Sequence, residues 1–267
     1  MLQRIGSKRA KYYGIMDLTS GYHQAPLSVA SRILTAFITF MGVFEYLRVP
    51  MGIKGSAAYF QQVMATVVLV GLIHIICECY QDDILTFGST TVEFINNLRE
   101  VFLRLRKHKL TVNPKKCQFG LEQIEYVGHT ISQEGISISQ DKREEVFNIE
   151  KPTLQKHLKS FIGCAEYFHS HIRDFSGTMR PLHDMVRNYE KNKKLVWTPE
   201  AESAWDTIRD QIRACPTLLF IDSNAPIYLH TDASDYGIGA YLFQTIDGID
   251  RPIAFMGKSL SDYLTLS

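Results

Sequence analysis

The chain has 267 residues, of which 45% are hydrophobic and 21% are charged. This composition excludes a disordered chain and leaves room for roughly two globular domains. The 29 lysines and arginines nearly balance the 28 acids, so the net charge of +1 gives no global sign of nucleic-acid binding, and any basic surface has to be local.

Neither the apolar stretches nor the cysteines of the chain indicate a membrane protein or an oxidising compartment. The most apolar stretch, residues 63–77, is interrupted by polar residues and is shorter than the ~20 residues that a membrane span needs. The N-terminus has no apolar secretion signal, and the five cysteines lack the paired spacing of a zinc site. We expect an intracellular protein whose cysteines are reduced core thiols.

The first elements in chain order are strands. Residues 12–18 form an apolar run that ends in turn-forming residues, which predicts a buried strand with Asp17 near its end. Residues 36–40 and 44–49 are aromatic and β-branched, so they predict a hairpin. A turn is expected at residues 52–55.

A helix and a second strand pair follow. Gly55-Ser56 is a candidate cap, after which apolar residues recur at helical spacing up to Val67. We expect residues 63–77 to be a buried helix that runs into a buried strand. The strands 75–80 and 84–87 are separated only by Gln81-Asp82-Asp83.

The remainder alternates irregularly between helix and strand. An amphipathic helix is predicted around residues 95–105, a strand over 124–131, and helices over 141–149 and 154–165. Residues 188–194 are the best linker candidate, and Thr198-Pro199 opens the next helix. Short strands are expected at 227–231, 239–243 and 252–255. The order of elements predicts an α+β fold with a mainly helical middle region.

Adjacent aspartates in a tight strand connection are the first sign of chemistry. Asp82 and Asp83 would raise each other's pKa unless a cation intervened, and magnesium prefers such carboxylate oxygens together with substrate phosphates. Asp17, from another strand, would complete a two-metal site. Taken alone, however, Asp-Asp is more often an ordinary turn, because aspartate bonds its own backbone there.

Several motifs that occur together, in order along the chain, favour the metal site over the ordinary turn. They are Met16-Asp17-Leu18-Thr19-Ser20-Gly21-Tyr22-His23-Gln24, Thr35-Ala36-Phe37, residues 47–55 (LRVPMGIKG), Tyr59-Phe60-Gln61, Tyr80-Gln81-Asp82-Asp83-Ile84-Leu85, Asn113-Pro114-Lys115-Lys116-Cys117, residues 127–132 (VGHTIS), Phe161-Ile162-Gly163 and Thr231-Asp232-Ala233-Ser234. Through them the chain resembles the reverse transcriptases of gypsy-type long-terminal-repeat retrotransposons. The match runs along almost the whole chain.

The resemblance implies a fold and a domain division. It implies an α+β right-hand polymerase palm that lacks most of its fingers, over residues 1–135. A thumb-like helical region would span 136–192, and a connection with a truncated ribonuclease H-like α/β unit would span 193–267. A local excess of basic over acidic residues in the thumb-like region would suit contact with a nucleic-acid duplex.

The resemblance also implies the catalytic residues. Asp17 and Asp82 would bind two Mg²⁺ ions, with Mn²⁺ as a possible substitute, while Asp83 and the carbonyl of Leu18 would support the site. Tyr22 would be the steric gate against a ribose 2′-hydroxyl, and its alternative is an ordinary packed tyrosine.

Three further segments match residues that contact substrate in the family. Met51 and Gly52 would lie beneath the templating base pair, Gln81 would lie beside the primer terminus, and Gly128-His129 would grip the primer, with a packed strand end as an equal alternative for that last pair. Lys54 could reach a phosphate or be solvated.

The sequence departs from the family pattern at several points. Family members normally carry an apolar residue where this chain has Gln81, and commonly a proline where it has Ala57. Only 16 residues precede Asp17, so we expect most of the fingers to be absent.

Asp232 matches the first metal-binding aspartate of the ribonuclease H domain, whose other ligands would lie beyond Ser267. We therefore expect no ribonuclease H activity.

The leading hypothesis is an RNA-directed DNA polymerase that acts on a primed RNA or DNA template with deoxynucleoside triphosphates. Other retrotransposon gag or pol products are candidate partners, and a cytoplasmic particle or the nucleus is the expected location. The main alternative is a catalytically dead remnant that at most binds nucleic acid. A palm left unstable by missing fingers is the third reading.

Overall fold

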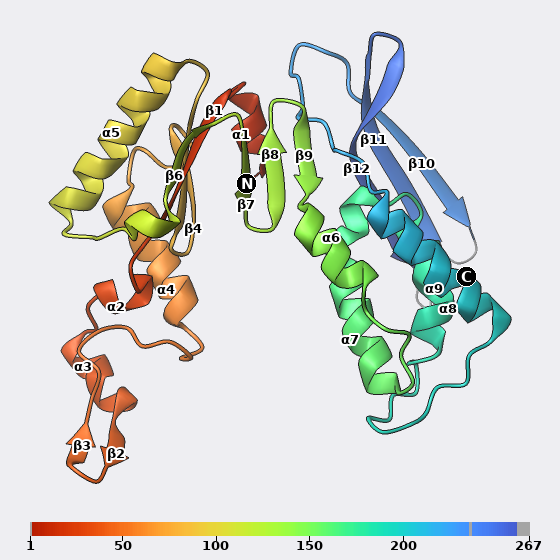
Figure 1. The fold of residues 1–267 in the computed structure, drawn as a ribbon, viewed down its shortest axis with the longest axis horizontal. Coiled ribbons are helices and arrows are strands. Elements are labelled where there is room, and N and C mark those ends of the chain that lie inside the picture. The colour runs from red at the N-terminus through yellow and green to blue at the C-terminus, as the bar shows by residue number, and fades with distance from the viewer. Residues whose placement is uncertain (1, 235–236, 261–267) are drawn as a thin grey trace. The chain divides into compact units, whose positions relative to one another are not determined.

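The computed structural model describes residues 2–234 and 237–260 of the chain (Figure 1). The chain divides into two compact units, Met1–Val127 and Gly128–Ser267. Among the described residues, no helix combines the length and the apolar character that crossing a bilayer would require. Both units mix helices with antiparallel sheet, which confirms the predicted α+β class.

The first unit is built around one four-stranded antiparallel sheet. Its strands lie in the order β4-β5-β1-β6. The elements of this unit are α1 (Leu2–Ser7), β1 (Tyr12–Asp17), α2 (Gly21–Gln24), α3 (Val29–Arg32), η1 (Ile33–Thr35), β2 (Phe37–Thr39), β3 (Gly42–Phe44), α4 (Ser56–Val63), η2 (Met64–Val68), β4 (Cys77–Tyr80), β5 (Asp83–Gly88), α5 (Thr91–Lys107), η3 (Pro114–Lys116), β6 (Gln118–Leu121) and β7 (Gln123–Tyr126).

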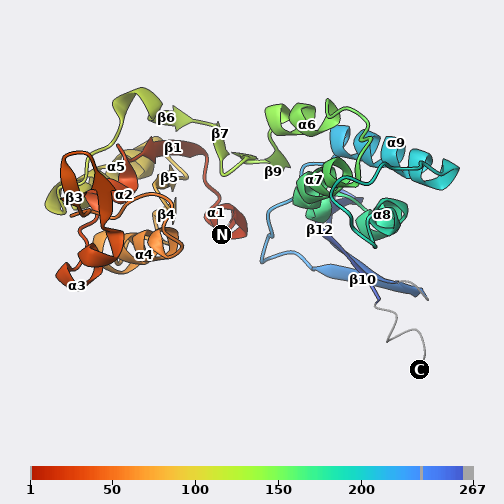
Figure 2. The same ribbon diagram turned by 90° about the horizontal axis from the view of Figure 1, so that it is seen from below.

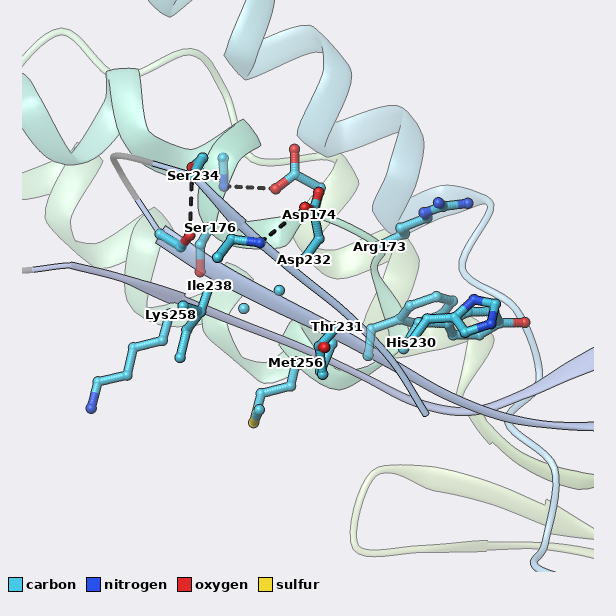
Figure 3. Close-up of a pocket in the computed structure, with 18 of the residues that line it drawn as sticks. Arg173, Asp174, Ser176, His230, Thr231, Asp232, Ser234, Ile238, Met256 and Lys258 are labelled. Atoms are coloured by element: carbon cyan, nitrogen blue, oxygen red, sulfur yellow. Dashed lines mark hydrogen bonds between the residues drawn. The ribbon is translucent and has the colours of Figure 1, made fainter. Parts of the chain in front are cut away.

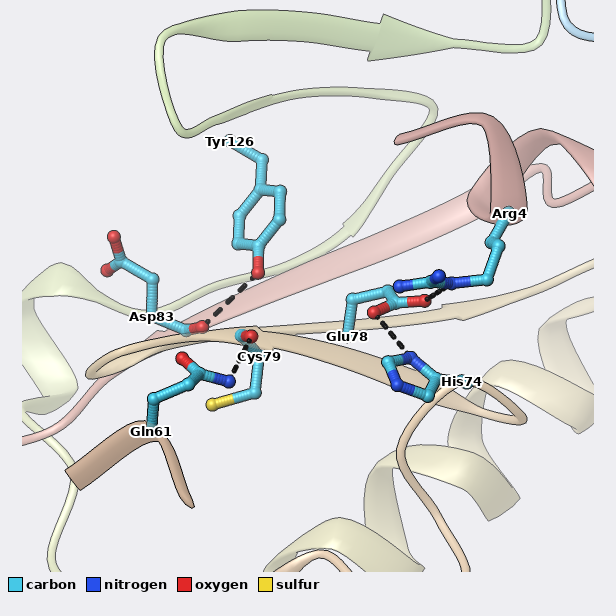
Figure 4. Close-up of polar contacts among 7 residues, drawn as sticks. All are labelled: Arg4, Gln61, His74, Glu78, Cys79, Asp83 and Tyr126. Carbon is cyan, nitrogen blue, oxygen red and sulfur yellow. Dashed lines mark hydrogen bonds and ion pairs between the residues drawn. The ribbon is translucent and has the colours of Figure 1, made fainter. Parts of the chain in front are cut away.

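The two faces of this sheet have different neighbours. Successive side chains of a strand point to opposite faces, so Met16 and Asp17 face opposite ways. Met16 shares a buried core with Phe60 of α4 and Val101 of α5. The face that carries Asp17 is approached instead by β7, where Tyr126 is buried and donates from its hydroxyl to the carbonyl of Asp83 at 3.4 Å (Figure 4).

Local sequence explains the main helix of this unit. Thr90 caps the N-terminus of α5, where its hydroxyl accepts from the amide of Glu93 at 3.2 Å. The buried positions Phe94, Val101 and Leu105 recur at helical spacing, and three basic residues occupy the last turn, as the helix dipole favours. The predicted helix is therefore present, and it is longer than its apolar spacing indicated.

The expectation for residues 63–77 is wrong in part. Only the π-helical turn η2 continues α4, after which the chain turns through residues 69–76 before β4 begins at Cys77. His74 has a positive φ of 69° in this connection. Its Nδ1 contacts Oε2 of the buried Glu78 at 2.9 Å, and Glu78 also accepts from Nε of Arg4 at 3.1 Å (Figure 4). A buried carboxylate thus organises the segment, and the apolar pattern did not show it.

The second unit combines a helical layer with a three-stranded meander (Figure 2). Its core joins α7, α8 and α9, where the rings of Phe161 and Trp205 lie 4.2 Å apart. Strand β12 packs on η4 and α8. The elements are β8 (His129–Ser132), β9 (Gly135–Ile138), α6 (Gln140–Phe147), α7 (Gln155–Ala165), η4 (Glu166–His171), α8 (Phe175–Asp184), α9 (Pro199–Arg213), β10 (Tyr228–Ser234), β11 (Gly237–Ile246) and β12 (Ile249–Ser259).

The sequence predictions for this unit hold for its helices better than for its strands. Thr198 caps α9 and proline occupies its first position, as expected. The strand expected over 124–131 is divided by Val127 and Gly128, which both have positive φ. The last three strands extend beyond their apolar centres, because antiparallel pairing continues through the polar residues at their ends. All five cysteines are free thiols.

Candidate functional site

Two of the three candidate carboxylates lie opposite each other on neighbouring strands. In the antiparallel pairing of β1 and β5, Asp17 is the partner of Asp83. The amide of Leu18 donates to the carbonyl of Asp82 at 3.2 Å, so the adjoining Asp17–Asp83 pair is one without direct backbone hydrogen bonds. Such pairs bring their side chains closest together. Strand register therefore places both carboxylates on one face.

The third carboxylate belongs to the turn that joins β4 and β5. Tyr80 pairs with Asp83, so Gln81 and Asp82 form a two-residue connection. Gln81 has a φ of 56°, in the left-handed region that costs a non-glycine residue roughly 1–2 kcal/mol. Helix α2 approaches this turn closely, because a Cβ on Gly21 would lie 2.7 Å from that of Asp82. Only glycine fits at position 21.

A glutamine of α4 holds the strained turn. Oε1 of Gln61 accepts from the amide of Gln81 at 2.7 Å. Its Nε2 donates to the carbonyl of Cys79 at 3.1 Å, as Figure 4 shows. The thiol of Cys79 in turn donates to the carbonyl of Gln81 at 3.2 Å. Gln61 belongs to the Tyr-Phe-Gln motif, but its role could not be read from the sequence.

The site carries concentrated negative charge. Partial burial raises the pKa of Asp83, and the neighbouring charges of Asp82 and then Asp17 raise it further, whereas Lys116 lowers it. Nζ of Lys116 donates to Oδ2 of Asp17 at 3.0 Å, and this hydrogen bond raises the pKa of Lys116. Lys116 belongs to the Asn-Pro-Lys-Lys-Cys motif, and nothing in that motif predicts its contact with Asp17.

The donor chemistry fits a divalent cation, although the side chains are not arranged as a finished cage. Carboxylate oxygens are ligands that Mg²⁺ prefers, and a cation would relieve the repulsion from Asp82 and Asp17 that adds to burial in raising the pKa of Asp83. Within residues 2–234 and 237–260, however, no three His, Cys, Asp or Glu side chains converge into a metal site. The carboxylates would have to reorient, and Asp17 would have to exchange its contact with Lys116.

Tyr22 lies beside the turn. Its hydroxyl donates to Oε1 of Gln81 at 2.8 Å, and its ring lies 5.3 Å from that of Phe60. Burial raises the pKa of Tyr22, and the charges of Asp82 and Tyr80 add to the effect. The hydroxyl therefore stays protonated and acts as a donor. The structure brings Tyr22 and Gln81 together, which no local pattern predicted.

The other candidate residues of the first unit are less closely connected. Leu18 is buried and continues β1 toward Val112 through an isolated bridge. Met51 and Gly52 lie in an exposed loop before α4, where Gly52 has a φ of 89°. Ser56 does not cap α4 with its side chain, since its hydroxyl donates to the carbonyl of Pro50 at 2.9 Å and so anchors this loop.

Gly128 and His129 belong to the second unit. Gly128 has a φ of 73°, and a Cβ there would lie 2.6 Å from the hydroxyl oxygen of Tyr167. That hydroxyl lies 2.9 Å from Nδ1 of His129. The ring of His129 is 6.0 Å from that of His171, which is buried. The pair therefore has packed neighbours within its own unit.

Asp232 lies in β10 of the second unit, beside a cavity of about 510 Å³ (Figure 3). The carboxylate is exposed, and its Oδ1 accepts from the amide of Ala233 at 2.9 Å. Arg173, Arg180 and Lys258 are among the lining residues, together with Asp174. Basic groups thus outnumber the carboxylates among these charged lining residues.

Two family models match separate segments of the chain. Residues 3–131 match the family model described as reverse transcriptase (RNA-dependent DNA polymerase). Residues 197–265 match the model of the RNase H-like domain found in reverse transcriptase.

Curated proteins that are similar to this chain include polyproteins of transposons. The Pol polyprotein from transposon opus of Drosophila melanogaster is 34% identical and covers 94% of this chain. That from transposon 412 of the same organism is 30% identical and covers 98%. This chain spans only 26% and 21% of their respective lengths.

Solved structures show the same fold. The foamy viral protease-reverse transcriptase in complex with RNA/DNA hybrid has a TM-score of 0.82 and is 25% identical. The matched region covers 99% of this chain and 36% of the foamy viral chain. A second structure of that protein, in complex with double-stranded DNA, has a TM-score of 0.82 and 24% identity, covering 97% of this chain and 44% of its own.

Proposed function

Because this chain belongs to the reverse transcriptase family, through residues 3–131, we propose that it is the polymerase portion of a long-terminal-repeat retrotransposon Pol protein of gypsy type. The reaction is RNA-directed DNA synthesis. The primer 3′-hydroxyl oxygen attacks the α-phosphorus of a deoxynucleoside triphosphate, the bond from that phosphorus to the bridging oxygen breaks, and pyrophosphate leaves while the hydroxyl proton is released.

The observation that carries this proposal is the register of β1 and β5. It sets Asp17 opposite Asp83, with Asp82 in the adjoining turn, and burial followed by the charges of Asp82 and Asp17 raises the pKa of Asp83. Asp17, Asp82 and Asp83 would hold two Mg²⁺ ions, or Mn²⁺ in their place. When bound, such ions neutralise charge on the attacking and leaving oxygens of a phosphoryl transfer.

The remaining residues position substrate in this proposal. Tyr22 excludes a ribose 2′-hydroxyl, Leu18 and Gln81 border the nucleotide and primer, and Met51-Gly52 support the templating base pair. Gly128 and His129 contact the primer strand. The foamy viral relatives were solved with an RNA/DNA hybrid and with double-stranded DNA, which supports a primed template as partner.

The domain division remains part of the proposal. It consists of a palm over residues 1–135, a thumb-like region over 136–192 and a connection with an RNase H-like domain over 193–267. The family matches over residues 3–131 and 197–265 support the first and the last of these, and the thumb-like region lies between them. The expectation that this chain does not cleave RNA by itself stays a prediction.

Primer extension tests the polymerase. The purified chain is given a DNA primer on an RNA template, deoxynucleoside triphosphates and Mg²⁺, beside Asp82→Asn and the control Asp206→Asn, which alters an exposed aspartate of α9. We expect extension by wild type and control, and a loss of at least about a hundredfold in Asp82→Asn, as for other charge-stabilising groups. No extension by any protein would instead favour the nonenzymatic remnant, and equal extension by all three would reject the assigned site.

A further inference from the structure

A chain of polar contacts joins helix α2, the β4–β5 turn and helix α4. It begins at the hydroxyl of Tyr22, which donates to Oε1 of Gln81 at 2.8 Å. It continues from the amide of Gln81 to Oε1 of Gln61 at 2.7 Å. Residues 22 and 81 are 59 positions apart in the chain. Gln81 is the link that connects the tyrosine to the turn.

Three polar groups of Gln81 have hydrogen-bond partners. Its amide donates to Gln61, its carbonyl accepts from the thiol of Cys79, and its side-chain oxygen accepts from Tyr22. A non-glycine residue with a φ of 56° persists only where its surroundings hold it. These contacts supply that restraint, so the side chain of Gln81 leaves the backbone from a fixed point.

Tyr22 is held from two directions as a result. Its ring packs at a tilt against Phe60, with 5.3 Å between centroids, and its hydroxyl is tied to Gln81. An apolar side chain at position 81 could fill the same volume but could not accept a hydrogen bond. The ring would then keep the Phe60 contact and lose its restraint at the hydroxyl end.

We propose that Gln81 is a positioning residue for sugar selection, because its side-chain amide fixes the Tyr22 ring between α2 and the turn that carries Asp82. This inference rests on the proposed polymerase function and on Tyr22 as the residue that meets the sugar. A ring fixed at both ends presents a constant surface to the 2′ position, whereas a ring fixed only by Phe60 can move aside for a hydroxyl.

Substitution at position 81 tests the proposal through the ratio of kcat/KM for deoxyribonucleotide to that for ribonucleotide. Gln81→Met replaces the amide oxygen with a thioether, a much weaker acceptor, at similar volume. We expect the ratio to fall about two- to tenfold, the equivalent of one net hydrogen bond. The fall in the ratio should come mainly from a lower KM for the ribonucleotide.

Two further variants distinguish positioning from a merely structural role. Tyr22→Phe removes the donor of the same bond, so the double variant Tyr22→Phe with Gln81→Met should be no less selective than Gln81→Met alone. Gln81→Glu retains an acceptor and should restore the ratio. Its added charge acts on both nucleotides alike, so it cancels in the comparison.

Gln62→Met is the matched control, since Gln62 is the exposed neighbour of Gln61 on α4 and lies in the same helix. It should leave the ratio unchanged. If the wild type is active and Gln81→Met has the same selectivity, the inference is wrong but the proposed function stands. The same conclusion follows if the effects of Tyr22→Phe and Gln81→Met simply add. A wild type that extends no primer would reject the proposed function, and this inference with it.

Discussion

Nζ of Lys116 lies 3.0 Å from Oδ2 of Asp17, although the two residues are 99 positions apart in the chain. The lysine side chain is 63% exposed and that of Asp17 only 20%. The ammonium therefore reaches from solvent onto a largely buried carboxylate at the end of β1. It takes an oxygen that a divalent cation would also use, so the two cations compete for Asp17.

Removing that ammonium should strengthen cation binding. We expect Lys116→Gln to bind Mn²⁺ about two- to fivefold more tightly than wild type, the range in equilibrium constant of an exposed ion pair. Calorimetric titration of the metal-free protein measures the change. Lys115→Gln is the control, because it removes a neighbouring exposed lysine and should bind like wild type. Equal affinities in all three proteins would show that Lys116 does not compete.

Asp83→Asn should stabilise the metal-free protein in a pH-dependent way. The folded pKa of Asp83 is raised above its ordinary value of 3.8, so the unfolded chain loses this proton first as the pH rises. The stability that wild type has below pH 3.8 is therefore lost as the pH rises through the folded pKa, and the variant avoids this loss. Urea unfolding in a chelator measures the difference, which should grow from acid to neutral pH and shrink when Mg²⁺ is added. A difference that is constant with pH would contradict the prediction.

His171 should make the second unit sensitive to acid. Burial, and then the charge of His129, lowers the pKa of His171 from 6.5 to about 4. The unfolded chain therefore takes up this proton first, and stability is lost as the pH falls from 6.5 to about 4. The loss is on the order of 3 kcal/mol.

Unfolding of His171→Leu followed over this range should show a shallower pH dependence than wild type, whatever its overall stability. His157→Leu, at an exposed histidine of α7, should keep the wild-type slope. Identical slopes for His171→Leu and wild type would remove His171 as the cause.

Arg4 should stabilise the first unit through Glu78. The carboxylate of Glu78 is 1% exposed and is shared by Arg4 and His74. Arg4→Met leaves it with one fewer charged donor, which should lower the free energy of unfolding by about 1.5–3 kcal/mol. Chemical denaturation measures the loss. Lys8→Met, just beyond the same helix, should change stability by less than about 0.5 kcal/mol. Similar values for both variants would contradict a specific role for Arg4.

The sequence was informative where structure follows from local pattern. Periodicity and caps identified α5 and α9, and the apolar run 12–18 correctly placed Asp17 at the end of a strand. The short connection between β4 and β5 was also foreseen. These features depend on neighbours within a few residues, which is the range that hydrophobic periodicity and turn chemistry report.

The contacts that define the candidate site are of another kind. Tyr22 with Gln81 and Lys116 with Asp17 join residues that are 59 and 99 positions apart. Such pairs depend on how the sheet and helices pack, and they have no local signature. The turns between η2 and β4 were missed for a similar reason, because the partners of Glu78 lie partly in α1.

The register of β1 against β5 has a consequence for folding. Side chains alternate between the faces of a sheet, so a slip of one residue would leave Asp17 and Asp83 on opposite sides. A slipped chain could not gather these carboxylates around one ion. Divalent cations, by binding only the correctly aligned strands, would therefore draw the folding equilibrium toward the native pairing. The metal would then select the native register of β1 and β5 during folding, in addition to its role in the reaction.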